Sequence, residues 1–249
     1  MKNKVIVITG ATSGLGAAAV NAFAALGAKV AFCGRRRKEG MEIENRARDK
    51  GGDATFIQTD VTIESQVENL ISETIRLHGR IDVAFNNAGG NLYFGPMENM
   101  TGEQFAANIM LNLTGTFYSM KYEIKAMKQS GGSIINTAST AGVKGVSQGI
   151  ASYVAAKHGV VGLTKAAALE QAKNQIRINS LIISAMATEQ WLEGVNKTPG
   201  LFEKIALSMP LGRVATVDDI IPLILFLASD GSKMITGASL AIDGGTTAG

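Results

Sequence analysis

The 249-residue chain predicts a single α/β domain, residues 1–249, in which a doubly wound parallel sheet of about seven strands carries helices on both faces. Three observations predict this fold class. Short apolar runs alternate with longer segments of helical periodicity along the whole chain. No internal repeat, low-complexity stretch or linker interrupts the alternation. Glycine-rich and polar motifs follow the ends of the apolar runs, where sheets of this kind bind their ligands.

The expected strands are the apolar runs. The first, Lys4–Thr9, is continuous and rich in β-branched residues, which is typical of a parallel strand covered on both faces. The others follow in order at Lys29–Cys33, Ala54–Gln58, Ile81–Asn86, Ser133–Thr137, Arg177–Ile183 and Ser239–Ile242.

The expected helices occupy the intervals between the strands. The first runs from about Gly14 to Leu26 and is stopped by Gly27, and a second, polar helix at about Lys38–Lys50 ends before Gly51. The third carries Val67, Leu70, Ile71 and Ile75 at helical spacing and ends at His78-Gly79. The remaining helices are expected at Gly102–Gln129, Ser152–Gln171, Leu201–Ser208 and Val217–Ser229.

The composition of the chain argues against several classes of protein, including nucleic-acid-binding and membrane proteins. Charged residues make up 18% of the chain, against about 25% on average, and the net charge is +3. The one basic block, Arg35–Lys38, is too small to indicate nucleic-acid binding. No apolar run approaches the roughly 18 residues of a membrane span, and the N-terminus has no secretory signal pattern. Because the single cysteine, Cys33, excludes an intramolecular disulfide, we expect a cytoplasmic protein. No cluster has metal-ligand spacing.

A glycine-rich turn follows the first strand and opens the first helix. Its glycines, Gly10, Gly14 and Gly16, allow a tight turn and a close approach of the backbone to a pyrophosphate. The free N–H groups of the helix N-terminus attract the same anion. Alone, the motif would equally suit a plain flexible turn. In this context it predicts a Rossmann-type dinucleotide site formed by Gly10, Thr12, Ser13, Gly14, Leu15 and Gly16.

The end of the second strand indicates which dinucleotide binds. NAD sites usually have an acidic residue there to hold the ribose hydroxyls, but this chain has Gly34, followed by Arg35 and Arg36. Arginine suits two-pronged binding of phosphate. Arginines just before a helix N-terminus also oppose the helix dipole, which a bound phosphate would offset. We therefore expect NADP (NADPH), with NAD as the alternative. The alternative interpretation of these arginines is a solvated surface cluster with no ligand.

Two further strand ends extend the predicted cofactor site. Asp60-Val61 follows the third strand, where a carboxylate can accept a hydrogen bond from the adenine amino group. Asn87, Ala88 and Gly89 follow the fourth strand, where small residues let the backbone pass close to the cofactor. Either motif alone would be a strand cap or a turn.

Tyr153 and Lys157 lie four residues apart on an expected helix and so share one face. An ammonium group beside a phenol favours the phenolate and lowers the tyrosine pKa from its usual value of about 10. Such a phenol can donate and accept a proton near neutral pH. Together with the nucleotide site, this pair predicts hydride transfer between a nicotinamide cofactor and a carbonyl group.

The order of these motifs resembles that of the short-chain dehydrogenase/reductase family, from Thr9-Gly10 to Asp243-Gly244-Gly245. The resemblance implies a catalytic tetrad of Asn112, Ser139, Tyr153 and Lys157. Tyr153 would exchange a proton with the carbonyl oxygen, and Ser139 would polarise that carbonyl. Lys157 would lower the Tyr153 pKa and bind the nicotinamide ribose. Asn112, which alone would be a helix-interior amide, would hold a water that links Lys157 to solvent.

The sequence departs from the family pattern in two places. After the sixth strand the family usually has Pro-Gly near the nicotinamide, whereas this chain has Ile183-Ser184, which restores an N–H that proline lacks. Thr188 stands where the family contacts the carboxamide, so we expect Ile183 and Thr188 in the cofactor site. The segment between Ser139 and Tyr153 is about one residue longer than expected. Its Val146, Ser147 and Gln148 are expected to line the substrate pocket.

Two surface features remain. Gly194, Pro199 and Gly200 divide residues 186–209 into short amphipathic stretches, which suits either a substrate lid with Trp191 facing the pocket or a pair of surface helices. The helix at 152–171 is rich in small residues, which permit close helix approach, and in the family this helix packs against a partner subunit. We therefore expect a homotetramer or homodimer.

Three functions are compatible with these motifs. The first is an NADPH-dependent ketone reductase, reversible as an alcohol dehydrogenase, whose partner is a small-molecule carbonyl or alcohol. The second is a 3-oxoacyl-carrier-protein reductase, for which Lys125, Lys128 and Lys173 would partly replace the docking arginines of such enzymes. The third is a non-catalytic nucleotide-sensing protein, against which the complete tetrad argues.

Overall fold

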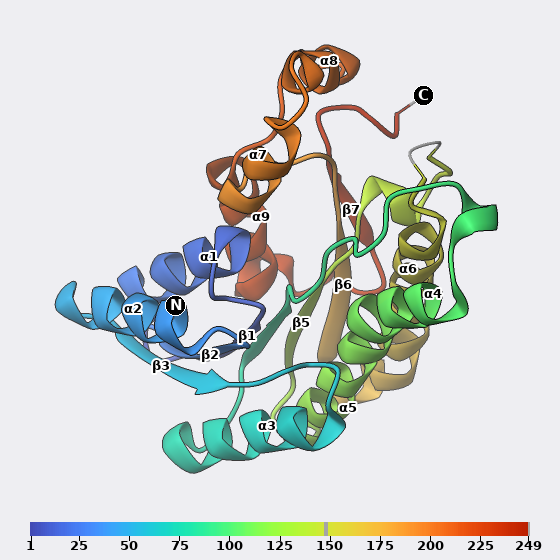
Figure 1. The fold of residues 1–249 in the computed structure, drawn as a ribbon. Helices are drawn as coiled ribbons and strands as arrows, with labels where there is room; N and C mark the ends of the chain where they lie inside the picture. The colour runs from blue at the N-terminus through green and yellow to red at the C-terminus, as the bar shows by residue number, and fades with distance from the viewer. Residues whose placement is uncertain (147–148, 249) are drawn as a thin grey trace.

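The computed structural model describes residues 1–146 and 149–248, in which strands and helices alternate along the chain (Figure 1). The strands are β1 (Val5–Thr9), β2 (Lys29–Gly34), β3 (Asp53–Gln58), β4 (Val83–Asn86), β5 (Gly132–Thr137), β6 (Ile176–Ile183) and β7 (Ser239–Ile242). The α-helices are α1 (Gly14–Ala25), α2 (Arg37–Asp49), α3 (Glu64–His78), α4 (Gly102–Ile109), α5 (Gly115–Met127), α6 (Ala151–Gln171), α7 (Glu189–Val195), α8 (Leu201–Ser208) and α9 (Val217–Ala228).

The strands form one sheet in the order β3-β2-β1-β4-β5-β6-β7, and neighbouring strands pair in parallel. The chain order reverses between β1 and β4, which creates the switch point where such sheets bind ligands. Thr9 at the end of β1 pairs with Asn86 at the end of β4. The glycine-rich turn and the segment after β4 therefore start side by side, and the predicted fold class is confirmed.

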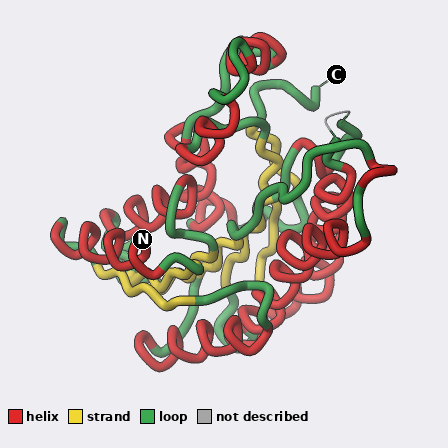
Figure 2. The backbone as a smooth tube through the Cα atoms, viewed as in Figure 1, coloured by secondary structure: helices red, strands yellow, loops and turns green. Residues whose placement is uncertain are grey.

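Helices cover both faces of the sheet (Figure 2). On one face α1, α2 and α9 pack against strand residues such as Ile6 and Phe32. On the other face α3, α5 and α6 pack against the alternate strand residues, such as Val7 and Ile178. Because β1 is buried along its whole length between the two helix layers, its side chains are predominantly apolar in both directions, as its continuous apolar run predicted.

The helix expected at Gly102–Gln129 is present as a continuous helical segment that ends at Met127. It contains a π-helical turn at Met110–Thr114, which separates α4 from α5. Asn108 and Asn112 turn their side chains inward and bond to the backbone of the segment after β4. The wider turn brings these side chains to that segment, which is a common use of π-helical turns at functional sites.

Residues 186–209 form α7 and α8, which extend away from the body of the sheet (Figure 1). A parallel bridge between Met186 and Ala215 anchors the base of this segment. Trp191 packs edge-on against Phe202, with ring centroids 6.2 Å apart, and so joins α7 to α8. None of the helices within the described ranges is long and apolar enough to cross a membrane.

Candidate active site

The four residues of the expected tetrad come from three parts of the chain. Ser139 follows the carboxyl end of β5, Tyr153 and Lys157 lie in the first two turns of α6, and Asn112 lies in the π-helical turn. Gly89 lies next to two of them, since a Cβ placed on it would be 2.7 Å from Oδ1 of Asn112 and 3.4 Å from Nζ of Lys157. A side chain at position 89 would therefore push these two groups apart.

Ser139 and Tyr153 form the polar pair at the centre of the site. The backbone N–H of Ala141 donates to Oγ of Ser139 at 3.1 Å, which leaves the serine O–H to act as a donor. Burial raises the pKa of Tyr153 to about 12, and a hydrogen bond with Ser139 lowers it in part. The phenol is thus protonated at neutral pH and able to donate a proton.

Lys157 is 2% exposed, and its Nζ donates to the carbonyl oxygen of Thr137 at 2.7 Å. The same Nζ lies 5.5 Å from the ring centroid of Tyr153. Burial lowers the pKa of Lys157 to about 8. The pKa of Tyr153 is raised in this structure because burial of the phenol is the largest influence on it, while Nζ of Lys157 faces the ring and bonds to a strand carbonyl; the lowering of the Tyr153 pKa by Lys157 stays a prediction.

Asn112 holds the segment that follows β4. Its Nδ2 donates to the carbonyl oxygen of Gly90 at 2.9 Å, while Gly90 N–H donates to its Oδ1 at 2.9 Å. A third bond runs from Nδ2 to the carbonyl oxygen of Asn108 at 3.1 Å. Asn108 in turn accepts from the backbone N–H of Leu92 at 3.1 Å. The side chain of Asn112 therefore has a positioning role, and its predicted water-holding role stays a prediction.

The glycine-rich turn fits a pyrophosphate. Within the described residues, the N-cap of α1, Ser13, makes no side-chain cap, and the first turn of the helix contains no acidic residue. The backbone N–H groups and the positive end of the helix dipole are thus directed at the space a bound anion would take. Asn87 donates from Nδ2 to the carbonyl oxygen of Gly10 at 2.9 Å, and so joins the segment after β4 to this turn.

Arg36 lies on the glycine-rich turn. Its Nη2 donates to Oγ of Ser13 at 2.6 Å and to Oγ1 of Thr12 at 3.1 Å, while half of the side chain is exposed. Arg35 is also exposed, and its carbonyl oxygen accepts from Nε2 of Gln58 at 3.0 Å. One face of the Arg36 guanidinium group is thus fixed by two hydroxyls beside the predicted dinucleotide site.

Because Gly34 has no side chain, Thr12 can occupy the space next to it. A Cβ placed on Gly34 would lie 2.5 Å from Cγ2 of Thr12, much closer than van der Waals contact. The acidic residue that would bind the ribose hydroxyls of NAD at this position would therefore displace Thr12 and, with it, the hydrogen bond to Arg36.

We expect Gly34→Asp alone to weaken binding of both NADPH and NADH at least about tenfold, the equivalent of about 1.4 kcal/mol. The aspartate clashes with Thr12, which Arg36 holds by a hydrogen bond. Adding Thr12→Gly makes room, so the double variant should regain NADH binding and not NADPH binding. Calorimetric titration of both cofactors measures this. Additive effects of the two substitutions would contradict the steric argument.

The remaining predicted cofactor residues lie around the same turn. Asp60 accepts at Oδ1 from N and Oγ1 of Thr62, which fixes its carboxylate, and Val61 is buried. Thr188 lies against the turn, because a Cβ on Gly14 would be 3.1 Å from its Cγ2. The side chain of Ile183 is buried in the core on the α1 and α9 face, so only its backbone is available to a ligand.

Of the residues predicted to line the substrate pocket, Val146 and Trp191 lie within the described part of the chain. Val146 is half-buried in the segment between Ser139 and Tyr153, whereas Ser147 and Gln148 lie outside the described residues. The backbone N–H of Trp191 donates to Oγ1 of Thr188, and its ring packs against the ring of Phe202.

Sequence reasoning missed the segment after Gly89. Leu92 and Phe94 are exposed there, at 54% and 75%, and the N–H of Gly95 donates to the carbonyl oxygen of Gly149 at 2.9 Å. This bond places residues 90–95 beside the chain that leads into Tyr153. The apolar residues directly after the small-residue motif were a usable signal for an exposed apolar segment beside the site. In the described ranges no group of His, Cys, Asp and Glu suits a metal ion.

We expect Lys157→Met to abolish turnover yet raise the melting temperature by a few degrees at about pH 7. The folded protein holds Lys157 at a pKa of about 8, below its ordinary 10.5, so between these values the unfolded chain binds more protons and stability rises with pH. Below about pH 8 the folded protein bears the whole energetic cost of burying the charged ammonium of Lys157, and Lys157→Met removes this cost. The substitution also removes the hydrogen bond to Thr137, which offsets about 1 kcal/mol of the gain in stability.

The gain should therefore shrink as the pH approaches about 10. Thermal unfolding monitored by circular dichroism at several pH values measures it. Lys165→Met, an exposed lysine on the same helix, is the matched control and should show neither the gain nor its pH dependence. Equal destabilisation of Lys157→Met at every pH would contradict the argument.

Comparison with known proteins agrees with this geometry. A family model described as "Enoyl-(Acyl carrier protein) reductase" matches residues 10–247. The chain is 37% identical over 250 residues to a 2,5-dichloro-2,5-cyclohexadiene-1,4-diol dehydrogenase of Sphingobium indicum, covering 100% of this chain and 98% of that protein. It is 39% identical over 252 residues to a trans-4-hydroxycyclohexanecarboxylate dehydrogenase of Sinomonas cyclohexanicum, covering 99% and 93%.

A solved structure of an actinorhodin polyketide ketoreductase variant with NADPH superimposes with a TM-score of 0.93, at 29% identity and 99% coverage of each chain. Relatives of this kind are dehydrogenases and reductases of alcohols and ketones, and bind nicotinamide cofactors. With matching sequence over nearly its whole length and the same sheet around the same site, the chain belongs to the short-chain dehydrogenase/reductase family.

Proposed function

We propose that the protein is an NADP(H)-dependent oxidoreductase that interconverts a cyclic ketone and its secondary alcohol, with Tyr153 as the general acid and base. The observation that carries the proposal is the placement of Tyr153 next to both Ser139 and Lys157, with Lys157 also next to Gly89 of the segment after β4. The cyclic substrate class is inferred from two relatives, whose names specify a cyclohexadiene diol and a hydroxycyclohexane carboxylate.

Each residue has a definite part in the reaction. The bound cofactor supplies a hydride to the carbonyl carbon in reduction and accepts it in oxidation. Tyr153 gives its phenolic proton to the carbonyl oxygen, so that hydride and proton together convert C=O to CH–OH. The Ser139 hydroxyl donates to the same oxygen and stabilises its developing negative charge. Lys157, with a positive charge below about pH 8, stabilises the phenolate that Tyr153 becomes.

The preference for NADP over NAD is argued from the end of β2. Arg36 is anchored to Thr12 and Ser13 with half of its side chain exposed and its Nη1 4.0 Å from Oε1 of Glu39, and the exposed Arg35 lies next to it, so both are placed to contact a ribose phosphate. Thr12 fills the space that an acidic residue at position 34 would need. NAD is the alternative cofactor.

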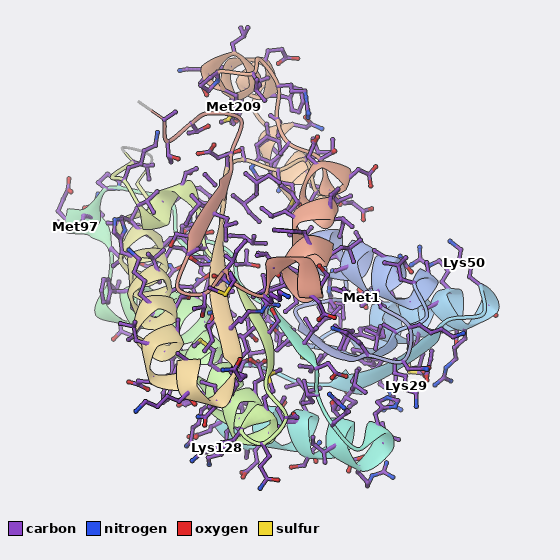
Figure 3. The ribbon with its side chains drawn as sticks, turned by 180° about the vertical axis from the view of Figure 1, so that it is seen from behind. Met1, Lys29, Lys50, Met97, Lys128 and Met209 are labelled. Carbon is purple, nitrogen blue, oxygen red and sulfur yellow. The ribbon has the colours of Figure 1, made fainter. Side chains whose placement is uncertain are left out.

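A carrier-protein substrate is the second candidate, and the description of the matching family model favours testing it. Two of the lysines expected to dock a carrier protein do not lie at the same edge of the sheet as the site. Lys128 follows α5 and Lys173 precedes β6, so both lie at the edge where the strands begin, whereas Ser139 lies at the edge where β5 ends. In Figure 3, Lys128 lies at the opposite end of the molecule from Met209, which follows the α7–α8 segment.

We also infer that a second copy of the chain binds at the outer face of α5 and α6. An apolar groove of about 410 Å³ lies there, lined by Leu113, Thr114, Phe117, Gly159, Gly162, Leu163 and Ala166. Phe117 is 44% exposed, and a Cβ on Gly162 would meet nothing within 4 Å in its own chain. A homotetramer or homodimer would cover this surface. A monomer in light scattering at micromolar concentration would contradict it.

The test of the proposed function is the loss of reduced-nicotinamide absorbance with NADPH or NADH over cyclic ketones, cyclic diketones, open-chain ketones and acyl thioesters. The proposal expects fastest turnover with NADPH and a cyclic ketone. Faster turnover of an acyl-carrier thioester, weakened steeply by salt, would favour the second candidate instead. Cofactor binding without turnover on any carbonyl would favour a nucleotide sensor.

A further inference from the structure

A buried acid lies behind the site and has no part in the reaction described above. Glu123 on α5 is 0% exposed, and its Oε2 accepts from Nδ2 of Asn86 at 2.9 Å. Asn86, itself buried, is the last residue of β4 and directly precedes Asn87, which bonds to the glycine-rich turn. Glu123 is thus one residue removed from the backbone that is expected to contact the cofactor.

The contact continues across the sheet. Nδ2 of Asn86 also donates to Oδ1 of Asn136 on β5 at 3.0 Å, and Nδ2 of Asn136 donates to Oγ1 of Thr164 on α6 at 2.9 Å. Glu123, Asn86, Asn136 and Thr164, which we call the buried polar cluster, all lie away from solvent. They join β4, β5, α5 and α6. Two of these elements carry the catalytic lysine and the carbonyl that it binds.

Two atoms of the buried polar cluster have no hydrogen-bond partner among the described residues: Oε1 of Glu123 and Oδ1 of Asn86. If Glu123 were ionised, both atoms would be acceptors with no donor, and each would cost about 1–3 kcal/mol. They belong to two groups that are already joined by one hydrogen bond. A proton on Oε1 of Glu123 makes this atom a donor, so that the carboxylic acid of Glu123 and the amide of Asn86 pair through two hydrogen bonds.

We propose that Glu123 is a positioning residue that acts as a neutral carboxylic acid, with Oε1 donating to Oδ1 of Asn86 while Oε2 accepts from its Nδ2. This double bond to Asn86 holds the end of β4 and the cofactor-binding segment Asn87–Gly89 that starts there. The proposal rests on the proposed function only where a cofactor is used as the readout.

The surroundings of Glu123 support a proton on it. Burial raises its pKa to about 8. The titratable group near it on β2 is the thiol of Cys33, which burial keeps neutral by raising its pKa to about 12. From β5 and α6 it shares the cluster with an amide and a hydroxyl, and α3 contributes apolar side chains to the same side of the sheet. None of these groups carries a positive charge that would stabilise the ionised form of Glu123.

The proton can be observed without a cofactor. At about pH 6 the difference infrared spectrum between the parent protein and Glu123→Gln should contain the C=O stretch of one protonated carboxyl group, sensitive to D₂O. The band should disappear as the pH rises through about 8. A difference spectrum with a carboxylate band alone at about pH 6 would overturn the proposal. Glu170→Gln, an exposed glutamate on α6, is the control and should give only a carboxylate band.

The positioning role is tested by NADPH titration, followed by calorimetry. Glu123→Gln keeps one donor and one acceptor, so its Kd should lie within about twofold of the parent at pH 7 and rise less between about pH 7 and 9. Glu123→Leu removes both bonds and should raise Kd at least tenfold, while kcat at saturating NADPH changes by less than about threefold. Parent-like NADPH binding by Glu123→Leu would overturn the positioning role.

Two further outcomes also decide the matter. If Glu123→Leu does not fold, the comparison of Glu123→Gln with the parent decides, and identical pH dependence of Kd in the two proteins would overturn the proposal. If the parent binds no NADPH, the proposed function fails, while the infrared experiment still decides the protonation state of Glu123.

Discussion

Tyr153→Phe should lower kcat by at least about 10²-fold, because the variant loses the group that gives its proton to the carbonyl oxygen. The phenyl ring remains, and with it the contact to Lys157, whose Nζ lies 5.5 Å from the ring centroid. The Kd for the cofactor should therefore stay within about threefold of the parent. The loss should appear in kcat and kcat/KM alike, as expected for an interaction made in the transition state.

Tyr122→Phe is the matched control for this experiment. Its hydroxyl bonds to Glu64 at 3.2 Å between α5 and α3, away from the site, so its removal should leave kcat unchanged. Steady-state turnover of the best ketone by both variants, with calorimetric titration of the cofactor, gives the comparison. Near-parent turnover by Tyr153→Phe would refute the assignment of the general acid.

Arg36→Ala should raise the KM for NADPH by about 10- to 100-fold and leave the KM for NADH nearly unchanged. A hydrogen bond to a charged group contributes about 1.5–3 kcal/mol, and each 1.4 kcal/mol corresponds to a factor of ten. Arg36 is the arginine that bonds to Thr12 and Ser13 on the glycine-rich turn, so its guanidinium is already oriented at the expected ribose phosphate. Less side-chain entropy is lost when such a group binds.

Arg37→Ala is the control, since Arg37 is an exposed residue at the start of α2 with the same charge. If the effect were one of general electrostatics, both variants would weaken NADPH binding equally and salt would remove the difference. Arg35→Ala should fall between the two. An unchanged ratio of NADPH to NADH efficiency in Arg36→Ala would contradict a phosphate site at the end of β2.

Local patterns account for the parts of the structure that were predicted correctly. The apolar runs correspond to the seven strands, and the glycine-rich turn opens α1 as expected, because strand periodicity and turn chemistry depend on near neighbours in the chain. The π-helical turn could not be predicted in this way. It depends on Gly90 and Leu92, which lie 22 and 16 residues before their partners Asn112 and Asn108.

Glu123 shows the same limit for an ionisable group. In the sequence it follows Lys121 and precedes Lys125, which is typical of a charged, exposed helix face. The structure buries it against Asn86, 37 residues away, and leaves Lys121 to pair with Glu64 on α3. Similarly, Arg35 and Arg36 are equivalent in the sequence, and only the contacts of Arg36 with Thr12 and Ser13 distinguish them.

The sequence by itself determined the alternation of strands and helices, the doubly wound sheet and the residue types at its strand ends. These follow from periodicity and from the chemistry of short motifs. Only the tertiary structure decided the π-helical turn around Asn112, the arginine that lies on the glycine-rich turn, and the burial that shifts the pKa values of Tyr153, Lys157 and Glu123. A pKa depends on burial and on partners supplied by distant parts of the chain, and these exist only once the chain has folded.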